Sequence, residues 1–68
     1  MPTLLIVDDD PPVRYSLRHG LEGPDMRVET AGTAAEAVDA VRRRPPDAAI
    51  LDVRLPDGSG LDLFDRLR

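Results

Sequence analysis

The sequence contains no cysteine, no lysine and no tryptophan, and it has little aromatic character. Without cysteine there is no disulfide framework, no thiolate metal site and no thiol nucleophile. Tyr15 and Phe64 are the only aromatic residues, so the core has to be aliphatic. No apolar run approaches the roughly 20 residues of a membrane span, and residues 1–3 lack the charged start of a signal peptide. We therefore expect a cytoplasmic protein that does not contact a membrane.

The charge balance is acidic, with 13 Asp and Glu against 9 basic residues, all of them Arg, and a net charge of −4. A chain of this sign is not expected to bind nucleic acid directly. The basic run at residues 42–44 stands at the end of a predicted helix, where cations interact favourably with the helix dipole. At 68 residues the chain is one small domain at most, and it buries only about 60% of its unfolded surface.

Three short segments have the pattern of β-strands. Residues 3–7 and 47–52 each contain a four-residue apolar run that is too short for a helix, which favours buried strands of a parallel sheet. Residues 26–30 alternate apolar and polar side chains, as a half-exposed edge strand does. Strands that alternate with helices predict a parallel sheet with right-handed crossovers. The expected strand order is 2-1-3, with the two apolar strands side by side.

Three helices are predicted after these strands. The first begins at Pro11, where Asp10 can cap its N-terminus, and it ends near Gly20. Thr33 and Glu36 form a capping box at the start of the second helix. The expected buried stripes are Val13, Leu17 and Leu21 in the first helix, Ala34, Ala37, Val38 and Val41 in the second, and Leu61, Phe64 and Leu67 in the third. The first helix should lie on one face of the sheet and the other two on the opposite face.

Carboxylates follow two of the three strands. Asp8, Asp9 and Asp10 come after the first strand, and Asp52 ends the third. Because the carboxyl ends of parallel neighbours meet at one edge of the sheet, Asp8, Asp9 and Asp52 are expected to converge there. Crowded carboxylates repel one another unless a cation lies between them, and the hard cation Mg²⁺ binds carboxylate oxygens.

Asp52 is the better candidate for a nucleophile among these residues. It stands singly at a strand end before a loop with Pro56, Gly58 and Gly60, and a carboxylate beside Mg²⁺ can attack phosphorus. Asp8 and Asp9 are better placed to hold the metal, and Asp10 is interpreted as a capping residue. The pattern alone leaves simple capping and solvation of these carboxylates open as the alternative.

The two acidic segments together resemble the receiver domain of bacterial two-component response regulators. Residues 6–10, Ile-Val-Asp-Asp-Asp, match a hydrophobic strand that ends in an acidic pair. Residues 52–60, Asp-Val-Arg-Leu-Pro-Asp-Gly-Ser-Gly, match the family pattern D-x-x-[ML]-P-x-x-[ST or D]-G. Each half alone is weak, but both at this spacing, with the matching order of strands and helices, are specific. The resemblance covers the whole chain.

The resemblance implies a flavodoxin-like, doubly wound α/β fold in which Asp52 accepts a phosphoryl group from a histidine kinase. It implies a Mg²⁺ site with Asp9 as a direct ligand and Asp8 acting through water, completed by Asp52 and the backbone carbonyl of Arg54. A domain of this kind is a regulatory module of signal transduction and transcription regulation rather than an enzyme. Its signal would pass to an output domain or downstream protein that is not in this chain.

The resemblance also predicts that residues 1–68 are the N-terminal half of a receiver domain. The family fold has strand order 2-1-3-4-5, with a switch hydroxyl on the fourth strand and a lysine on the fifth, and we expect both strands to lie outside this chain. One edge of the third strand would then be unpaired, and Ile6 and Ile50 would be partly exposed. The 68 residues alone are therefore expected to be part-folded or to associate through the third strand.

Two other functions stay open on the sequence. One is an interaction module derived from a receiver that works without phosphorylation, which phosphate uptake would distinguish. The other is a Mg²⁺-dependent phosphatase of the haloacid-dehalogenase type, which needs D-x-D-x-[TV] after its first strand. The chain offers D-x-D at Asp8 and Asp10 but has Pro12 where threonine or valine belongs, so this is the weaker alternative. His19, the only histidine, is interpreted as a surface residue.

Overall fold

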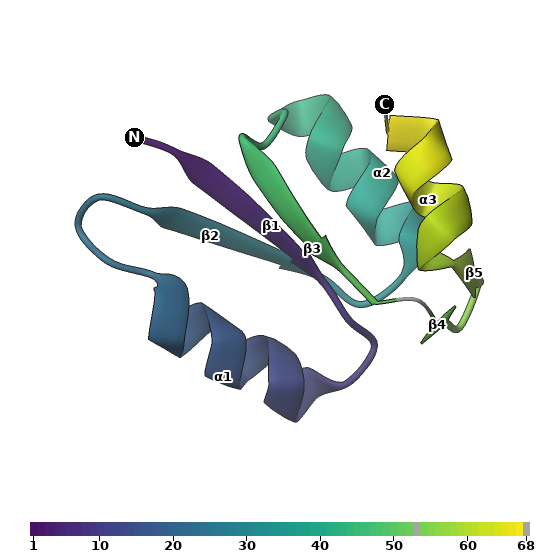
Figure 1. The fold of residues 1–68 in the computed structure, drawn as a ribbon, viewed down its shortest axis with the longest axis horizontal. Coiled ribbons are helices and arrows are strands. Elements are labelled where there is room, and N and C mark those ends of the chain that lie inside the picture. Colours follow the sequence, from purple (N-terminus) through teal and green to yellow (C-terminus); the bar gives the residue numbers. More distant parts are fainter. Residues whose placement is uncertain (53, 68) are drawn as a thin grey trace.

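The computed structural model describes residues 1–52 and 54–67, and a three-stranded parallel sheet lies at its centre (Figure 1). The strands are β1 (Thr3–Val7), β2 (Arg27–Ala31) and β3 (Ala48–Leu51). β1 is the middle strand, and it pairs in parallel with β2 on one side and with β3 on the other. The predicted fold class and the order 2-1-3 are therefore confirmed. β2 begins one residue later than predicted, and β3 is one residue shorter at each end.

Three helices cover the two faces of this sheet. They are α1 (Pro11–Leu21), α2 (Ala34–Arg43) and α3 (Gly60–Leu67). α1 lies on one face, while α2 and α3 lie together on the other, as right-handed crossovers require (Figure 1). Among the described residues, no helix has the length and apolar character needed to cross a membrane.

The aliphatic core has two layers, one on each face of β1, which is buried along its whole length. On one face, Leu5 and Val7 of β1 belong to a cluster with the small side chains of α2 and with Leu63 of α3. On the other face, Leu4 and Ile6 pack with Val28 of β2, and Leu17 of α1 and Met26 pack against them. The residues of α2 that were predicted to be buried lie in or against the first cluster, and Ala40 joins them. The corresponding prediction for α3, which names Leu61, Phe64 and Leu67, falls on side chains outside the described part of the structure.

The predicted buried face of α1 is wrong in part. Val13 is 37% exposed and Leu21 is 43% exposed, whereas Leu17 packs against the core. Residues four positions apart on a helix differ by about 40° in direction around its axis. When Leu17 faces the sheet, Val13 and Leu21 therefore point to either side of it. The helix also continues through Gly20 and ends at Leu21. Glu22 is its C-cap residue, and the Glu22 N–H donates to the Arg18 carbonyl at 2.8 Å.

β3 is more exposed than a buried strand should be. Ala48, Ala49 and Ile50 are exposed, and β3 lies at an edge of the described sheet. Ala48 and Ile50 lie on the face of α1, which packs against β1 and β2. The expected exposure of Ile50 is confirmed at 43%, but that of Ile6 is wrong, since Ile6 is fully buried. Ile6 belongs to the central strand and packs in the cluster that Leu17 of α1 joins.

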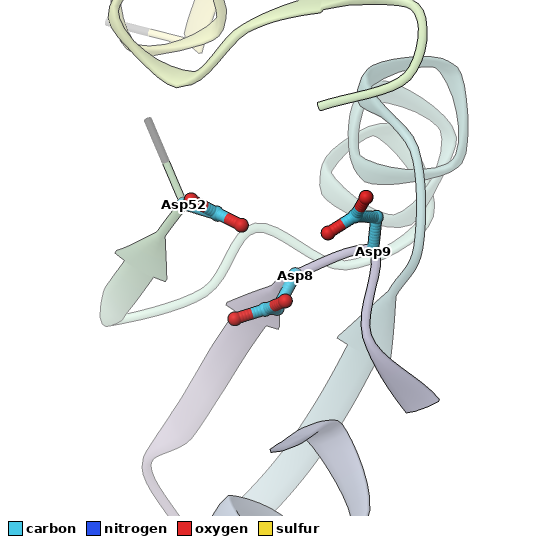
Figure 2. Close-up of side chains that lie close together, drawn as sticks. All are labelled: Asp8, Asp9 and Asp52. Carbon is cyan, nitrogen blue, oxygen red and sulfur yellow. The ribbon is translucent and has the colours of Figure 1, made fainter. Parts of the chain in front are cut away.

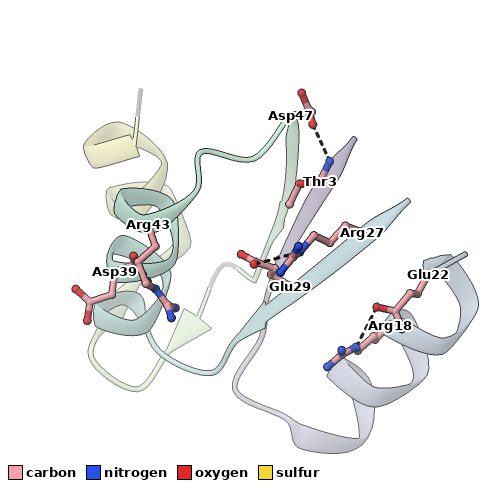
Figure 3. A network of polar contacts seen from close by, with 8 residues as sticks. All are labelled: Thr3, Arg18, Glu22, Arg27, Glu29, Asp39, Arg43 and Asp47. Carbon is pink, nitrogen blue, oxygen red and sulfur yellow. Dashed lines mark hydrogen bonds and ion pairs between the residues drawn. The ribbon is translucent and has the colours of Figure 1, made fainter. Parts of the chain in front are cut away.

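Polar contacts hold the amino ends of the strands (Figure 3). The Thr3 N–H donates to a carboxylate oxygen of Asp47 at 2.6 Å, and the Asp47 N–H donates back to the Thr3 carbonyl at 2.8 Å. Ion pairs join Arg27 to Glu29 at 3.6 Å and Arg18 to Glu22 at 3.4 Å. Exposed pairs of this kind contribute little to stability. The two bonds between Thr3 and Asp47 join β1 to β3 at the end opposite to the predicted acidic site.

Two sequence interpretations of surface residues are confirmed. The basic run lies at the end of α2, with Arg42 and Arg43 in its last turn and Arg44 as the C-cap. Arg43 also donates to the Asp39 carbonyl at 3.4 Å. His19 is exposed on α1, where its ring lies 4.2 Å from that of Tyr15.

Candidate functional site

Hydrogen bonds of the sheet continue one residue beyond β1 and β3 and place an aspartate at each strand end. The Asp8 N–H donates to the Ala31 carbonyl at 3.0 Å, and the Asp52 N–H donates to the Val7 carbonyl at 2.8 Å. Both residues therefore have their backbones fixed at the carboxyl edge of neighbouring parallel strands. This is the edge at which open α/β sheets form their sites.

The carboxylates of Asp8, Asp9 and Asp52 come together at this edge (Figure 2). One carboxylate oxygen from each residue lies within 4.8 Å of the other two. Asp8 and Asp52 are half-buried, whereas Asp9 is exposed. Figure 2 shows the side chains of Asp9 and Asp52 directed toward each other across the end of β1. The convergence expected from the parallel order is therefore present, while the roles of the three residues stay predictions.

Asp10 does not cap α1 in the way the sequence predicted. It occupies the N-cap position, but its side chain makes no capping hydrogen bond. An N-cap side chain can bond the N–H of the second or third helical residue; Pro12 at the second position has no N–H, which leaves Val13 as the one possible donor, and Asp10 does not bond it. The Asp10 N–H instead donates to one oxygen of the Asp8 carboxylate at 3.0 Å. This bond orients Asp8 and leaves its second oxygen for another partner.

Arg14 supports the acidic edge from α1, a role that the sequence analysis missed. One of its guanidinium nitrogens, Nη1, donates to the backbone carbonyl of Asp8 at 2.7 Å. The same nitrogen would lie 2.8 Å from a Cβ at Gly32, so the close approach depends on glycine at that position. An arginine six residues after Asp8 on the following helix was the available signal, but its reach is not visible in a sequence pattern.

The chain between Asp52 and α3 forms a small hairpin that the sequence did not predict. β4 (Arg54–Leu55) pairs antiparallel with β5 (Gly58–Ser59), and a turn at Pro56 and Asp57 joins them. Val53 and the side chain of Arg54 lie outside the described set. The backbone carbonyl of Arg54 as a metal ligand stays a prediction.

Asp57, at the tip of this hairpin, bonds to the N-terminus of α2. Its Oδ1 accepts from the Ala34 N–H at 2.7 Å, and its Oδ2 accepts from the Ala35 N–H at 3.0 Å. The bond from Ala34, followed by that from Ala35, holds the pKa of Asp57 below its ordinary value of 3.8. The sequence places Asp57 only in the loop after Asp52, and this contact was not predicted because its partners lie more than 20 residues away.

The predicted capping box of α2 is present, but one of its two hydrogen bonds has a different donor. The Thr33 hydroxyl accepts from the Glu36 N–H at 3.1 Å, as expected. The Glu36 carboxylate accepts from the Gly32 N–H at 3.1 Å rather than from the N-cap residue itself. Together with the two bonds to Asp57, these contacts satisfy four of the backbone donors in and before the first turn of α2.

The acidic cluster fits a hard divalent cation. Mg²⁺ binds oxygen at about 2.0–2.1 Å in octahedral geometry, so its ligand oxygens lie about 3–4 Å apart. The spread of up to 4.8 Å among the three carboxylates is only slightly wider. Among the described residues, this is the one group of three potential metal ligands.

Comparisons with known proteins identify the family that this chain resembles. The model of the response regulator receiver domain family matches residues 4–68. The probable transcriptional regulatory protein TcrX of Mycobacterium tuberculosis is 42% identical over 66 residues, which is 97% of this chain and 28% of TcrX. The transcriptional regulatory protein KdpE of Escherichia coli is 43% identical over 68 residues, which is all of this chain and 30% of KdpE.

A solved structure extends the likeness to the fold. The response regulator TrrA of Thermotoga maritima, determined in complex with Mg²⁺-BeF, superposes with a TM-score of 0.91 at 32% identity. The match covers all of this chain and 59% of the TrrA chain. The chain thus spans less than a third of the curated relatives named above and somewhat more than half of this structure.

Proposed function

The chain belongs to the receiver domain family of two-component response regulators, and we propose that it accepts a phosphoryl group on Asp52. The observation that carries the proposal is the meeting of three carboxylates at the carboxyl edge of β1 and β3, within 4.8 Å of one another. Asp52 is the member that stands singly at the end of a strand, before the hairpin. In this proposal the domain is a regulatory module that receives the group, rather than an enzyme that turns over a substrate.

In the proposed reaction, one carboxylate oxygen of Asp52 forms a bond to phosphorus. The bond between phosphorus and an imidazole nitrogen of the donor breaks at the same time, and that nitrogen keeps the electron pair. The product is an aspartyl phosphate. The hydrogen bond from the Asp52 N–H to the Val7 carbonyl fixes the backbone of the nucleophile before the donor arrives, which lowers the cost of orientation. The donor is a sensor histidine kinase, and the recipient of the signal is an output domain or a downstream protein.

Mg²⁺ is the cofactor of this proposal. Asp8, Asp9 and Asp52, with the backbone carbonyl of Arg54, would hold the ion, and when bound it offsets the negative charge of the transferring phosphoryl group. Asp9 is exposed and can reach the ion directly, whereas Asp8 has one oxygen engaged by the Asp10 N–H and keeps the other for a water ligand. The Mg²⁺ in the related TrrA structure supports the same ion here.

Phosphate uptake separates this proposal from an interaction module that works without phosphorylation. The haloacid-dehalogenase alternative finds no support, since Pro12 stands at the position of its hydroxyl or valine and the matching family is the receiver. Family membership supports a cytoplasmic location, where response regulators typically act.

The test is the intact mass of the protein after incubation with a small-molecule phosphodonor and Mg²⁺. We expect wild type to gain one phosphoryl group, Asp52→Asn to gain none, and the exposed-site control Asp62→Asn to behave as wild type. No uptake by folded wild type would favour the interaction module. A phosphoryl group that is still gained by Asp52→Asn, or that is located on Ser59 or His19, would refute the assignment of Asp52.

A further inference from the structure

Asp57 joins two parts of the molecule that are distant in sequence, the hairpin after Asp52 and the first turn of α2. Both of its carboxylate oxygens are engaged, one by each of two consecutive backbone N–H groups, at 2.7 and 3.0 Å. The N-terminus of a helix favours negative charge, and hydrogen bonds to an ionised carboxylate are stronger than neutral ones. The side chain is exposed and lies outside the acidic cluster, so its role is not that of a ligand.

The α2 end of this contact is firmly held. Ala34 is 4% exposed and belongs to the core cluster with Leu5 and Val7 of β1. Thr33 and Glu36 complete the cap on the same turn. The hairpin end is slighter, because the ladder of β4 and β5 has two residue pairs and its turn is exposed. Of the two parts that Asp57 joins, α2 is therefore the anchor and the hairpin is the part that is positioned.

The same anchor also adjoins the other side of the acidic cluster. The Ala31 carbonyl accepts from the Asp8 N–H, and Gly32 lies against the Arg14 side chain that bonds the Asp8 carbonyl. Residues 31–35 thus touch both the segment that carries Asp8 and, through Asp57, the hairpin that follows Asp52. Figure 1 shows β4 and β5 beside the end of α2 that follows β2.

Resting on the proposed function, we infer that Asp57 is a positioning residue for the Mg²⁺-dependent phosphorylation of Asp52. Its two bonds tie the hairpin to α2, and this hairpin carries the Arg54 backbone, whose carbonyl is a ligand of the cation in the proposed function. Asp57 touches neither the metal nor the phosphoryl group. It lowers the concentration of Mg²⁺ that the site needs.

The experiment measures the initial rate of phosphorylation of the intact protein by phosphoramidate against Mg²⁺ concentration. For Asp57→Ala we expect the half-saturating Mg²⁺ concentration to rise about tenfold, while the plateau rate is largely retained. Tenfold is the lower end of the loss of metal affinity that follows removal of a group that orients metal ligands. Asp57→Asn keeps one acceptor oxygen and should give an intermediate shift of about threefold. Asp62→Ala removes an equally exposed carboxylate from the first turn of α3 and should match wild type.

The split between half-saturation and plateau distinguishes positioning from general destabilisation. A purely structural role would lower the plateau with the folded fraction, measured by circular dichroism, and leave the half-saturating concentration unchanged. That result, or equal Mg²⁺ dependence in Asp57→Ala and Asp62→Ala, overturns the inference. If Asp57→Ala does not fold, the shift in Asp57→Asn decides.

Calorimetric titration with Mg²⁺ alone keeps this inference separate from the proposed function. If wild type binds Mg²⁺ but takes up no phosphoryl group, the proposed function is wrong. Asp57→Ala is still expected to bind Mg²⁺ about tenfold more weakly than Asp62→Ala, and equal affinities of the two variants would refute the positioning role.

Discussion

At the scale of the residue, Asp8, Asp9 and Asp10 are consecutive yet have three different environments. Asp8 is half-buried and accepts from the Asp10 N–H, Asp9 is exposed and reaches the cluster, and the Asp10 side chain makes no capping bond. We predict that Asp9→Ala weakens Mg²⁺ binding by at least about tenfold, since losing a group that merely orients a ligand already has such an effect. Asp10→Ala keeps the backbone donor to Asp8 and is the matched control. Calorimetry of both variants tests the assignment, and equal affinities would count against the metal pocket.

Arg14 and Arg18 lie one turn apart on α1 but differ in what their guanidinium groups bond. Arg14 donates to the Asp8 carbonyl in a partly buried contact, whereas Arg18 forms an exposed ion pair with Glu22. We predict that Arg14→Ala lowers the free energy of unfolding by about 1.5–3 kcal/mol, the range for a hydrogen bond that involves a charged group. Arg18→Ala should lower it by less than about 0.5 kcal/mol. Urea unfolding of the two variants is the measurement, and equal losses would contradict the role of Arg14.

The Asp57 carboxylate makes the stability of the fold depend on acid pH. Its pKa lies below the ordinary 3.8 because the Ala34 and Ala35 N–H groups bond its charged form. The stabilisation is therefore fully present above the unfolded-state pKa and is lost as the pH falls through the lower folded-state pKa. We predict a constant difference in melting temperature between wild type and Asp57→Ala near neutral pH, which shrinks as the pH falls below about 4. A difference that does not change with acidification would show that the carboxylate charge is not involved.

At the scale of the element, α2 packs on the sheet through small side chains. Ala37 has no exposed surface and lies in the cluster with Leu5 and Val7 of β1. We predict that Ala37→Leu lowers the free energy of unfolding by about 1–3 kcal/mol, because extra methylenes in a close-packed site force side chains and backbone to shift. Ala35→Leu on the exposed side of the same helix keeps the backbone donor to Asp57 and should change little. Denaturant unfolding compares the two, and an equal effect would contradict the tight packing.

The elements differ in how far local pattern predicts them. β1 and the cap of α2 follow from residues a few positions apart, such as the Thr33 and Glu36 pair, and the convergence of Asp8 with Asp52 follows from strand direction. The exposure of Ile50 depends on where α1 packs, and the buried Leu63 depends on how α3 meets α2. The bonds of Asp57 join backbone groups 22 and 23 residues away. No local periodicity encodes contacts of that separation, so the bonds of Asp57 to α2 and the hairpin that carries Asp57 were not predicted.

At the scale of the whole molecule, the described fold exposes somewhat more surface than its mass requires. Its accessible surface is 4539 Å² at 7.5 kDa, against about 4,200 Å² for a typical folded monomer of that mass. Exposed apolar side chains on β3 and α1 contribute, with Ile50 and Leu21 each 43% exposed. A few hundred Å² of apolar surface corresponds to several kcal/mol, which is comparable with the whole stability of a small domain.

The last prediction concerns residues 1–68 studied by themselves, whereas the unfolding measurements proposed above are made on the intact protein. In the described sheet β3 pairs with β1 alone, and an apolar strand with one open edge is a template for association, because its backbone groups otherwise depend on water. We predict that these residues associate with rising concentration and lack a sharp thermal transition when dilute. Ile50→Lys places a charge on that strand and should reduce association, whereas Tyr15→Lys, at a site 65% exposed on α1, should not. Sedimentation with a thermal melt is the measurement, and a dilute wild-type monomer that unfolds cooperatively would show the prediction to be wrong.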